Sequence, residues 1–255
     1  MPLEIVTIPC LSDNYAFLLH SSDSEETALI DAPEAGPILD ALKIRGWGLS
    51  EIWLTHHHWD HVDGVADLKE ATGARVIGAG TDAHRLPALN HSVAEGDDYV
   101  FAGHRVQIFD VSGHTVGHIA FYVADANAVF TADSLMALGC GRLFEGSPQQ
   151  MWASLSKLAK LPADTLVYSG HEYTASNARF AVTIEPDNNR LAERILYIEN
   201  TRAADLPTVP STLAEEIATN PFLRAHLPEV KAALSMSDVI DADVFAEIRK
   251  RKDQF

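Results

Sequence analysis

The chain has 255 residues, enough to bury a full hydrophobic core as one large domain or as a domain with a smaller appendage. Hydrophobic residues make up 47% of it, which is typical of a soluble globular protein. The formal net charge is −17. This charge argues against a nucleic-acid partner, because nucleic acids are held mainly by Lys and Arg on their phosphates, and it favours a small-molecule substrate.

Cysteine content and apolar runs give a prediction of compartment. Only two cysteines occur, Cys10 and Cys140, so we expect neither a disulfide framework nor a thiolate zinc site. The first residues lack a basic segment followed by a long apolar one, and no uncharged run reaches the roughly 18 residues that span a bilayer. We therefore expect a cytoplasmic protein without a membrane partner. A monomer is also expected, although no sequence feature determines the oligomeric state.

Short β-like runs dominate the first two thirds of the chain. Strands are predicted at 3–8, 15–19, 27–31, 51–55, 75–77, 105–111, 120–123, 128–131 and 165–168. Helices are predicted at 35–45, 62–71 and 148–160, the last with Ser147 as N-cap and Pro148 at its first position. Strands interrupted by a few helices predict two mixed sheets packed together with helices outside, an α/β sandwich.

The pattern changes after His171, where strand signals become rare. Helices are predicted at 175–183, 188–202, 212–219 and 241–252. We therefore expect a catalytic domain at residues 1–173 and an all-helical, substrate-binding domain at 174–255.

Residues 55–61 read Thr-His-His-His-Trp-Asp-His and follow a predicted strand. The next segment is helix-like, so we expect this run on a strand-to-helix loop, where functional residues often lie. Alternation along extended backbone places His56, His58 and Asp60 on one side, and the turn into the helix can bring His61 beside Asp60. The run therefore predicts two neighbouring groups of metal ligands.

Three more potential ligands each follow a β-like run: His114, Asp133 and His171. A single histidine in such a place is usually structural, but beside the run at 55–61 metal binding is favoured. His118 either supports this site from behind or has a structural role. The remaining histidines are interpreted as structural or surface residues: His20, His57, His84, His91, His104 and His226.

With these motifs the chain resembles the metallo-β-lactamase superfamily and, within it, glyoxalase II, the hydroxyacylglutathione hydrolase family. The resemblance rests on residues 55–61, 112–118 (Ser-Gly-His-Thr-Val-Gly-His), 130–135 (Phe-Thr-Ala-Asp-Ser-Leu), 139–146, 169–174 and 249–255. The first motif marks only the superfamily, and the last three indicate the family. The resemblance implies a four-layer αβ/βα sandwich, of α/β (α+β) class, followed by a C-terminal all-helical domain.

The resemblance also implies two metal ions. One would be held by His56, His58 and His114, the second by Asp60, His61 and His171, and Asp133 would bridge them. Imidazole and carboxylate ligands without thiolate suit Zn²⁺ and tolerate Fe or Mn. Two such ions can share a water and lower its pKa from about 15.7 toward 7, giving a hydroxide nucleophile that bridges the metals.

A metal-bridging hydroxide makes a protein nucleophile unnecessary, and the catalytic residues would be Asp60 and Asp133. The chain has no Gly-x-Ser-x-Gly elbow, and Cys140 is interpreted as structural.

Positions that contact glutathione in the family are matched by Arg142, Phe144, Tyr173, Arg249 and Lys252. Arg249 and Lys252 form an i, i+3 pair on one face of a helix and could reach the same ligand. The alternative for this basic run is a favourable interaction with the helix C-terminus. Phe144 stands where some members have tyrosine, and Arg142 where others have lysine, which keeps the charge but changes its geometry.

The favoured hypothesis is a binuclear hydrolase of S-(2-hydroxyacyl)glutathione thioesters. Its chief substrate would be S-D-lactoylglutathione, cleaved to D-lactate and glutathione in methylglyoxal detoxification. The alternatives are a mononuclear-iron persulfide dioxygenase of the same superfamily, a non-catalytic scaffold and a nuclease. The dioxygenase is disfavoured because all ligands for a second metal are present and because the helical region ends in a basic run. The intact ligand positions disfavour the scaffold, and the acidic net charge disfavours the nuclease.

Overall fold

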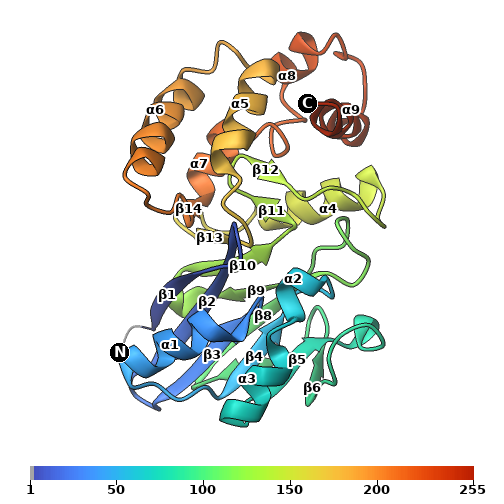
Figure 1. Cartoon of the computed structure of the whole chain (residues 1–255). Coiled ribbons are helices and arrows are strands. Elements are labelled where there is room, and N and C mark those ends of the chain that lie inside the picture. The colour runs from blue at the N-terminus through green and yellow to red at the C-terminus, as the bar shows by residue number, and fades with distance from the viewer. Residues whose placement is uncertain (1–2) are drawn as a thin grey trace. The chain divides into compact units, whose positions relative to one another are not determined.

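The computed structural model describes residues 3–255, which form two compact units. The first unit comprises the residues up to 110 together with 117–131, and the second comprises 111–116 and 132–255. This division differs from the predicted sequence domains 1–173 and 174–255, which remain a prediction. Figure 1 labels the helices and strands of both units.

The first unit contains a mixed six-stranded sheet with its strands in chain order. These are β1 (Glu4–Cys10), β2 (Asn14–Ser21), β3 (Glu26–Ile30), β4 (Glu51–Leu54), β5 (Arg75–Ala79) and β6 (His91–Val93). The pairs β1–β2 and β2–β3 are antiparallel, whereas β3 to β6 run parallel. Parallel neighbouring strands need crossover connections, and helices form the connections from β3 to β4 and from β4 to β5.

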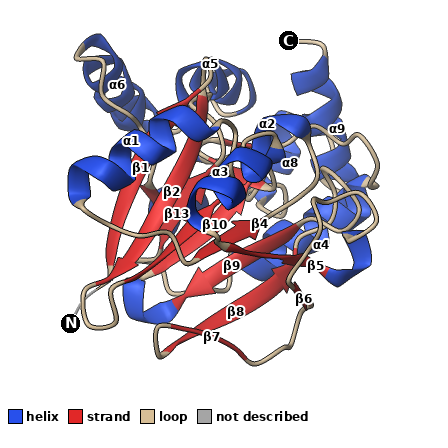
Figure 2. Ribbon diagram, turned by 60° about the horizontal axis from the view of Figure 1, so that its bottom comes forward, coloured by secondary structure: helices blue, strands red, loops and turns tan. Residues whose placement is uncertain are grey.

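The crossover helices are α1 (Ala35–Arg45), α2 (Trp59–Val62) and α3 (Val65–Thr72). Figure 2 shows α1 and α3 over one face of the sheet. Ile38 of α1 and Leu68 of α3 are fully buried in one apolar cluster with Leu29 and Ile52 of the strands. Burial of these side chains holds the helices on the sheet.

Four antiparallel strands form the second layer of this unit. They are β7 (Tyr99–Phe101), β8 (His104–Asp110), β9 (Ile119–Val123) and β10 (Ala128–Ala132). Trp53 of β4 is fully buried, and its ring centroid lies 5.3 Å from that of Phe101 and 5.1 Å from that of Phe121. These contacts join the two layers, so the predicted α/β sandwich is confirmed.

The helix predicted at 62–71 corresponds to α3, which begins at Val65, and a separate helix, α2, ends at Val62 just before a break at residues 63–64. A Cβ at Gly64 would lie 2.9 Å from the backbone nitrogen of Ala35, so the chain approaches α1 too closely for any other residue. The first helix begins at Trp59 rather than at Val62. Asp60 and His61 therefore lie on a helical turn and not on the loop where we expected them.

The second unit is mainly helical. Its strands are β11 (Leu135–Met136), β12 (Gly139–Cys140), β13 (Leu166–Ser169) and β14 (Ser211–Thr212). Its helices are α4 (Pro148–Leu158), α5 (Thr174–Ile184), α6 (Asn189–Ala203), α7 (Leu213–Thr219), α8 (Pro228–Ala233) and α9 (Asp241–Asp253). As expected, Ser147 caps α4, and it forms a capping box with Gln150. No helix within residues 3–255 is long and apolar enough to cross a membrane.

A buried carboxylate joins several segments of the second unit. Glu216 of α7 is fully buried and pairs with Arg194 of α6. It also accepts hydrogen bonds from Leu138 N at 2.8 Å, Ser211 Oγ at 2.6 Å and Asn220 Nδ2 at 3.0 Å. A buried charge is tolerated when it is paired and hydrogen-bonded in this way.

Replacing Glu216 by alanine should destabilise the protein strongly. The change leaves the buried Arg194 without its counter-charge, and breaking such a pair costs about 3–5 kcal/mol. Urea unfolding would measure the loss. Glu193→Ala is the matched control, since Glu193 pairs with Arg190 where both side chains are exposed, and it should cost less than about 1 kcal/mol. Equal free energies of unfolding for the two variants would contradict the role of Glu216.

Candidate metal centre

The ligand loop His56–His58 leaves the first sheet at the end of β4, and a buried acid fixes this exit. Asp31, at the end of β3, accepts hydrogen bonds from Thr55 N at 2.9 Å and from Thr55 Oγ1 at 2.8 Å. Its own backbone has φ +56°, a left-handed conformation that is uncommon outside glycine and is often found at functional sites. Asp31 therefore determines the position from which the loop starts.

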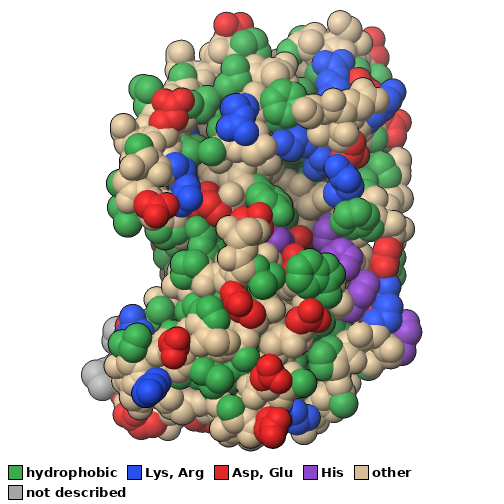
Figure 3. All heavy atoms as spheres, viewed as in Figure 1, with side chains coloured by type: hydrophobic (Ala, Val, Ile, Leu, Met, Phe, Trp, Pro, Cys, Tyr) green, Lys and Arg blue, Asp and Glu red, His purple; other side chains and the backbone are tan. Residues whose placement is uncertain are grey.

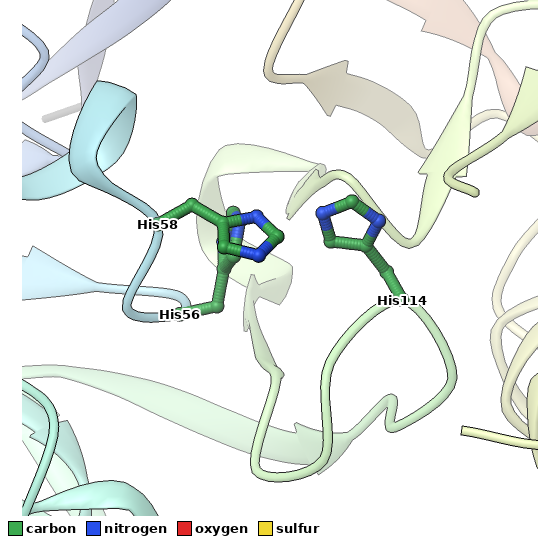
Figure 4. Close-up of side chains that lie close together, drawn as sticks. All are labelled: His56, His58 and His114. Carbon is green, nitrogen blue, oxygen red and sulfur yellow. The ribbon is translucent and has the colours of Figure 1, made fainter. Parts of the chain in front are cut away.

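The two outer histidines of this loop face each other. His56 Nε2 lies 3.1 Å from His58 Nδ1, and Figure 4 shows the two rings close together on the loop after β4. Two facing imidazole nitrogens offer two lone pairs to a metal ion. His56 is held further by Thr55 Oγ1, 3.0 Å from its Nδ1, and by the ring of His118, which stacks on it with centroids 4.5 Å apart. The stacked His118 ring thus restricts the orientation of the His56 ring, and its role in a metal site remains a prediction.

Asp60 and His61 form the second group of donors in this unit. His61 Nε2 lies 3.9 Å from Asp60 Oδ2, and His61 Nδ1 lies 2.8 Å from Asp31 Oδ2. A nitrogen bonded to a carboxylate carries the ring proton, so Nε2 keeps the lone pair that can bind metal. Asn14 holds Asp60 by donating from Nδ2 to its carbonyl oxygen at 3.0 Å and to Oδ2 at 3.2 Å.

The second unit brings three predicted ligands together at strand ends. His114 Nε2 lies 3.5 Å and His171 Nε2 lies 3.4 Å from the same oxygen, Oδ2 of Asp133. The other ring nitrogen of His114, Nδ1, lies 2.7 Å from the carbonyl oxygen of Arg142 and therefore donates to it. Figure 4 also draws His114, on the loop that follows β8. Asp133 is thus placed between two imidazoles, as a shared ligand would be.

Gly141 allows this arrangement. A Cβ at this position would lie 2.0 Å from the backbone oxygen of Asp133 and 2.8 Å from His114 Nδ1. Only glycine lets the chain pass so close to two predicted ligands. This close approach explains the glycine at position 141.

The donors present fit a divalent metal. All are imidazole nitrogens or carboxylate oxygens, a set that suits Zn²⁺ and accommodates Fe or Mn. The two cysteines take no part: both are buried, and burial raises the pKa of the Cys140 thiol to about 11. A thiol with this pKa stays protonated at neutral pH, which fits the structural interpretation of Cys140.

Three of the predicted substrate-binding residues lie at or near these ligands. The Tyr173 ring stacks on His171 with centroids 4.7 Å apart, and the Phe144 ring meets His114 edge-on at 5.3 Å. The side chain of Arg142 is 60% exposed. These positions are compatible with contact to a ligand near the metal donors, and the assignment remains a prediction.

The structure gives Arg249 partners within the protein. Its side chain is almost fully buried, donating to the carbonyl oxygen of Cys140 at 3.0 Å and to Asp253 Oδ1 at 2.9 Å. Lys252 is half-buried, and its Nζ lies 5.3 Å from the centroids of the Phe180 and Phe255 rings.

The environment of Lys252 changes its protonation. Burial, together with the charges of Arg249 and Arg179, lowers the pKa of Lys252 to about 8. Lys252 therefore titrates near physiological pH, unlike an ordinary lysine.

Sequence reasoning missed the residues that orient the ligands. Asp31 and Asn14 have no motif of their own, and their partners Thr55, Asp60 and His61 lie far along the chain. One signal for Asp31 was present: it ends a predicted strand, as Asp133 does. Asn14 gave no comparable signal.

Comparison with known proteins places the chain in a family. Residues 12–171 match the metallo-beta-lactamase superfamily, and residues 172–255 match the hydroxyacylglutathione hydrolase C-terminus. The hydroxyacylglutathione hydrolase of Roseobacter denitrificans is 64% identical over 255 residues, 100% of both chains. That of Methylococcus capsulatus is 52% identical over 253 residues, 99% of each chain.

Solved structures agree on the fold. ETHE1 from Myxococcus xanthus has a TM-score of 0.70 at 23% identity, over 98% of this chain and 90% of that one. TTHA1623 in a di-iron-bound form has a TM-score of 0.63 at 27% identity, over 88% of this chain and 100% of that one. The chain is therefore a metallo-β-lactamase-fold protein. Within that superfamily it belongs to the hydroxyacylglutathione hydrolase family.

The substitution Asp31→Asn should weaken metal binding while the protein stays folded. Asparagine tolerates the left-handed backbone, but it removes the charge that holds the proton on His61 Nδ1. Loss of such an outer partner typically lowers metal affinity about 10–100-fold. Competition with a chromophoric chelator would measure the affinity, with Asp67→Asn on the exposed side of α3 as control. An Asp31→Asn protein with wild-type zinc affinity would refute this role.

Proposed function

We propose that this chain hydrolyses S-(2-hydroxyacyl)glutathione thioesters, chiefly S-D-lactoylglutathione to D-lactate and glutathione. The observation that carries the proposal is 64% identity, over the whole of both chains, to a protein named hydroxyacylglutathione hydrolase. The match of residues 172–255 to the C-terminal region of that family supports it independently of the superfamily motifs. The reaction would serve methylglyoxal detoxification.

For the metal centre we propose two divalent ions. His56, His58 and His114 would hold one, Asp60, His61 and His171 the other, and Asp133 would be shared. Two observations support this set: His56 faces His58, and His114 and His171 both face Asp133. TTHA1623, the solved structure at 27% identity, is described in a di-iron-bound form, which supports it further. When bound, such ions supply a water of lowered pKa and polarise the thioester carbonyl. Zinc is the first candidate, and iron and manganese suit the same donors.

The catalytic work of the chain itself is proposed for two carboxylates. Asp60, held by Asn14 at both its backbone and its side chain, would orient the attacking water and hold its proton. Asp133, between His114 and His171, would keep those two imidazoles aligned. Both acids are at least partly buried, so their positions are fixed by the fold before substrate arrives.

For substrate binding we propose Arg142, Phe144, Tyr173, Arg249 and Lys252, the last two from the helical domain 174–255. Figure 3 shows Lys and Arg side chains gathered on the upper part of the face in view, where α8 and α9 lie. Asp253 Oδ1 lies 2.9 Å from Arg249 and 3.5 Å from Arg142 Nε, so this carboxylate joins the two guanidinium groups. Arg142 and Lys252 would then meet the glutathione carboxylates directly, and Arg249 would contribute to substrate binding by holding Asp253, which pairs with Arg142.

The alternative functions are less well supported. Full-length relatives at 52% and 64% identity carry the hydrolase name, which does not favour a persulfide dioxygenase or a non-catalytic scaffold. A monomer, a cytoplasmic location and the absence of a nucleic-acid partner remain predictions.

Metal-loaded protein should hydrolyse S-D-lactoylglutathione, followed by loss of the thioester absorbance, and chelator-stripped protein should not. Asp60→Ala should lower kcat by about 10²–10⁴, because a positioned proton acceptor contributes that much. Asp63→Ala, an exposed acid at the end of the same helical turn, serves as control and should keep wild-type kcat. Near-normal turnover by Asp60→Ala would exclude the proposed role of this residue.

The proposed role of Lys252 predicts a pH-dependent KM. Because its pKa is lowered to about 8, the ammonium is charged below that pH and neutral above it. Binding of a carboxylate should therefore weaken, and KM rise, as the pH increases from 7 to 9, with kcat little changed. In Lys252→Arg the side chain stays charged from pH 7 to 9, so this rise of KM should disappear. Lys252→Met should raise KM on the order of tenfold at pH 7.

Steady-state kinetics at several pH values separates these effects. A rise of KM that persists in Lys252→Arg would arise from the substrate or from another residue. A wild-type KM at pH 7 in Lys252→Met would contradict the assignment of Lys252 to the substrate.

A further inference from the structure

A second buried carboxylate lies behind the ligand loop and belongs to no proposed ligand set. Asp82, at the end of the 3₁₀ turn Gly80–Asp82, is 1% exposed. Its Oδ2 accepts a hydrogen bond from His57 Nδ1 at 3.0 Å, and its Oδ1 accepts one from Arg85 Nε at 2.5 Å. Each oxygen therefore has a partner, which makes an ionised carboxylate tolerable in this buried place.

His57 is the middle residue of the loop His56–His58. Its ring meets that of His58 edge-on, with centroids 5.1 Å apart. His56 Nε2 and His58 Nδ1 lie 3.1 Å apart, and His57 Nδ1 between them in sequence is bonded to Asp82 Oδ2 at 3.0 Å. A hydrogen bond to His57 thus restrains the backbone torsions that aim both outer rings.

Asp82 also supports the segment that carries His118. Gly117 has φ +95°, and a Cβ there would lie 2.9 Å from Asp82 Cβ. The backbone of Gly117, just before His118, therefore packs against the Asp82 side chain. The His118 ring in turn stacks on His56, with an interplanar angle of 10°. One buried side chain thus contacts two segments that both fix the orientation of His56.

We propose that Asp82 is a positioning residue for the metal centre, which holds His56 and His58 in their metal-binding arrangement through its contacts with His57 and Gly117. The inference rests on the proposed function in one respect, since it requires a metal ion at His56 and His58. A purely structural acid would stabilise the protein equally with and without metal. A positioning acid makes the loop ordered before the ion arrives, and so raises the affinity for metal.

The test compares the zinc affinity of folded variants with the thermal midpoint of the metal-free protein. Asp82→Ala should weaken zinc binding about 10–100-fold, the range typical of an outer partner of a metal site. Asp82→Asn should recover part of this loss, because its amide oxygen can still accept from His57. Asp125→Ala is the matched control: it removes a carboxylate bonded to His104 Nδ1 at 2.7 Å, 63% exposed, and should leave zinc affinity unchanged.

A second variant covers the case in which Asp82→Ala does not fold. His57→Ala leaves Asp82 paired with Arg85 and should weaken zinc binding as Asp82→Ala does. The double variant should lose no more than Asp82→Ala alone, because His57 acts on the site through Asp82.

Three outcomes would overturn the inference. The first is wild-type zinc affinity in Asp82→Ala beside a lowered thermal midpoint of the metal-free protein. The second is additive loss in the double variant. The third is wild-type zinc affinity in His57→Ala. A wild-type protein that binds no zinc, iron or manganese would instead refute the proposed function and, with it, this inference.

Discussion

The hydrogen bonding of one buried carboxylate determines how the ligand loop leaves the first sheet. Asp31 accepts from the backbone and the side chain of Thr55, and from His61 on the following helical turn. Its own backbone nitrogen donates to the carbonyl oxygen of Trp53 at 3.0 Å. Because a buried carboxylate is costly unless it is hydrogen-bonded, these partners cannot separate independently. Asp31 therefore couples the ends of β3 and β4 to the orientation of His61.

The sheets explain why such coupling is possible. The parallel strands β3, β4 and β5 end at the same edge, so the residues that follow them are neighbours although they are distant in sequence. Asp31 and Thr55 follow two of these strands, and the turn that bears Asp82 follows the third. In the second unit, Asp133 follows Ala132, whose carbonyl oxygen accepts from Gly170 N at 3.1 Å, just before His171. Strand ends thus carry both the donors and the residues that hold them.

Elements that depend on neighbouring residues were predicted from the sequence, whereas features that depend on residues far apart in the chain were not. The strands at 27–31 and 51–55 and the capped helix at 148–160 were predicted because apolar runs and capping residues are local signals. The break at Gly64 was not, since it depends on the backbone of Ala35, nearly thirty residues earlier. Short strands such as β6 and β14 were also missed, because they are defined by their pairing rather than by composition. Ligand types and their strand-end setting were visible, whereas Asp31, Asn14 and Asp82 became visible only through their partners.

Under the proposed function, the acidic net charge of the chain constrains how an anionic substrate is bound. The chain has 36 acidic and 19 basic residues, so a glutathione thioester, itself anionic, meets a repulsive field at long range. Physiological salt screens exposed charges beyond about 8 Å, which leaves the balance to groups at the site. There Arg142 and Arg249 share the carboxylate of Asp253, while Lys252 is half-buried beside aromatic rings with a pKa of about 8. Affinity would therefore come from a few short-range contacts, and substrate capture would gain little from long-range steering.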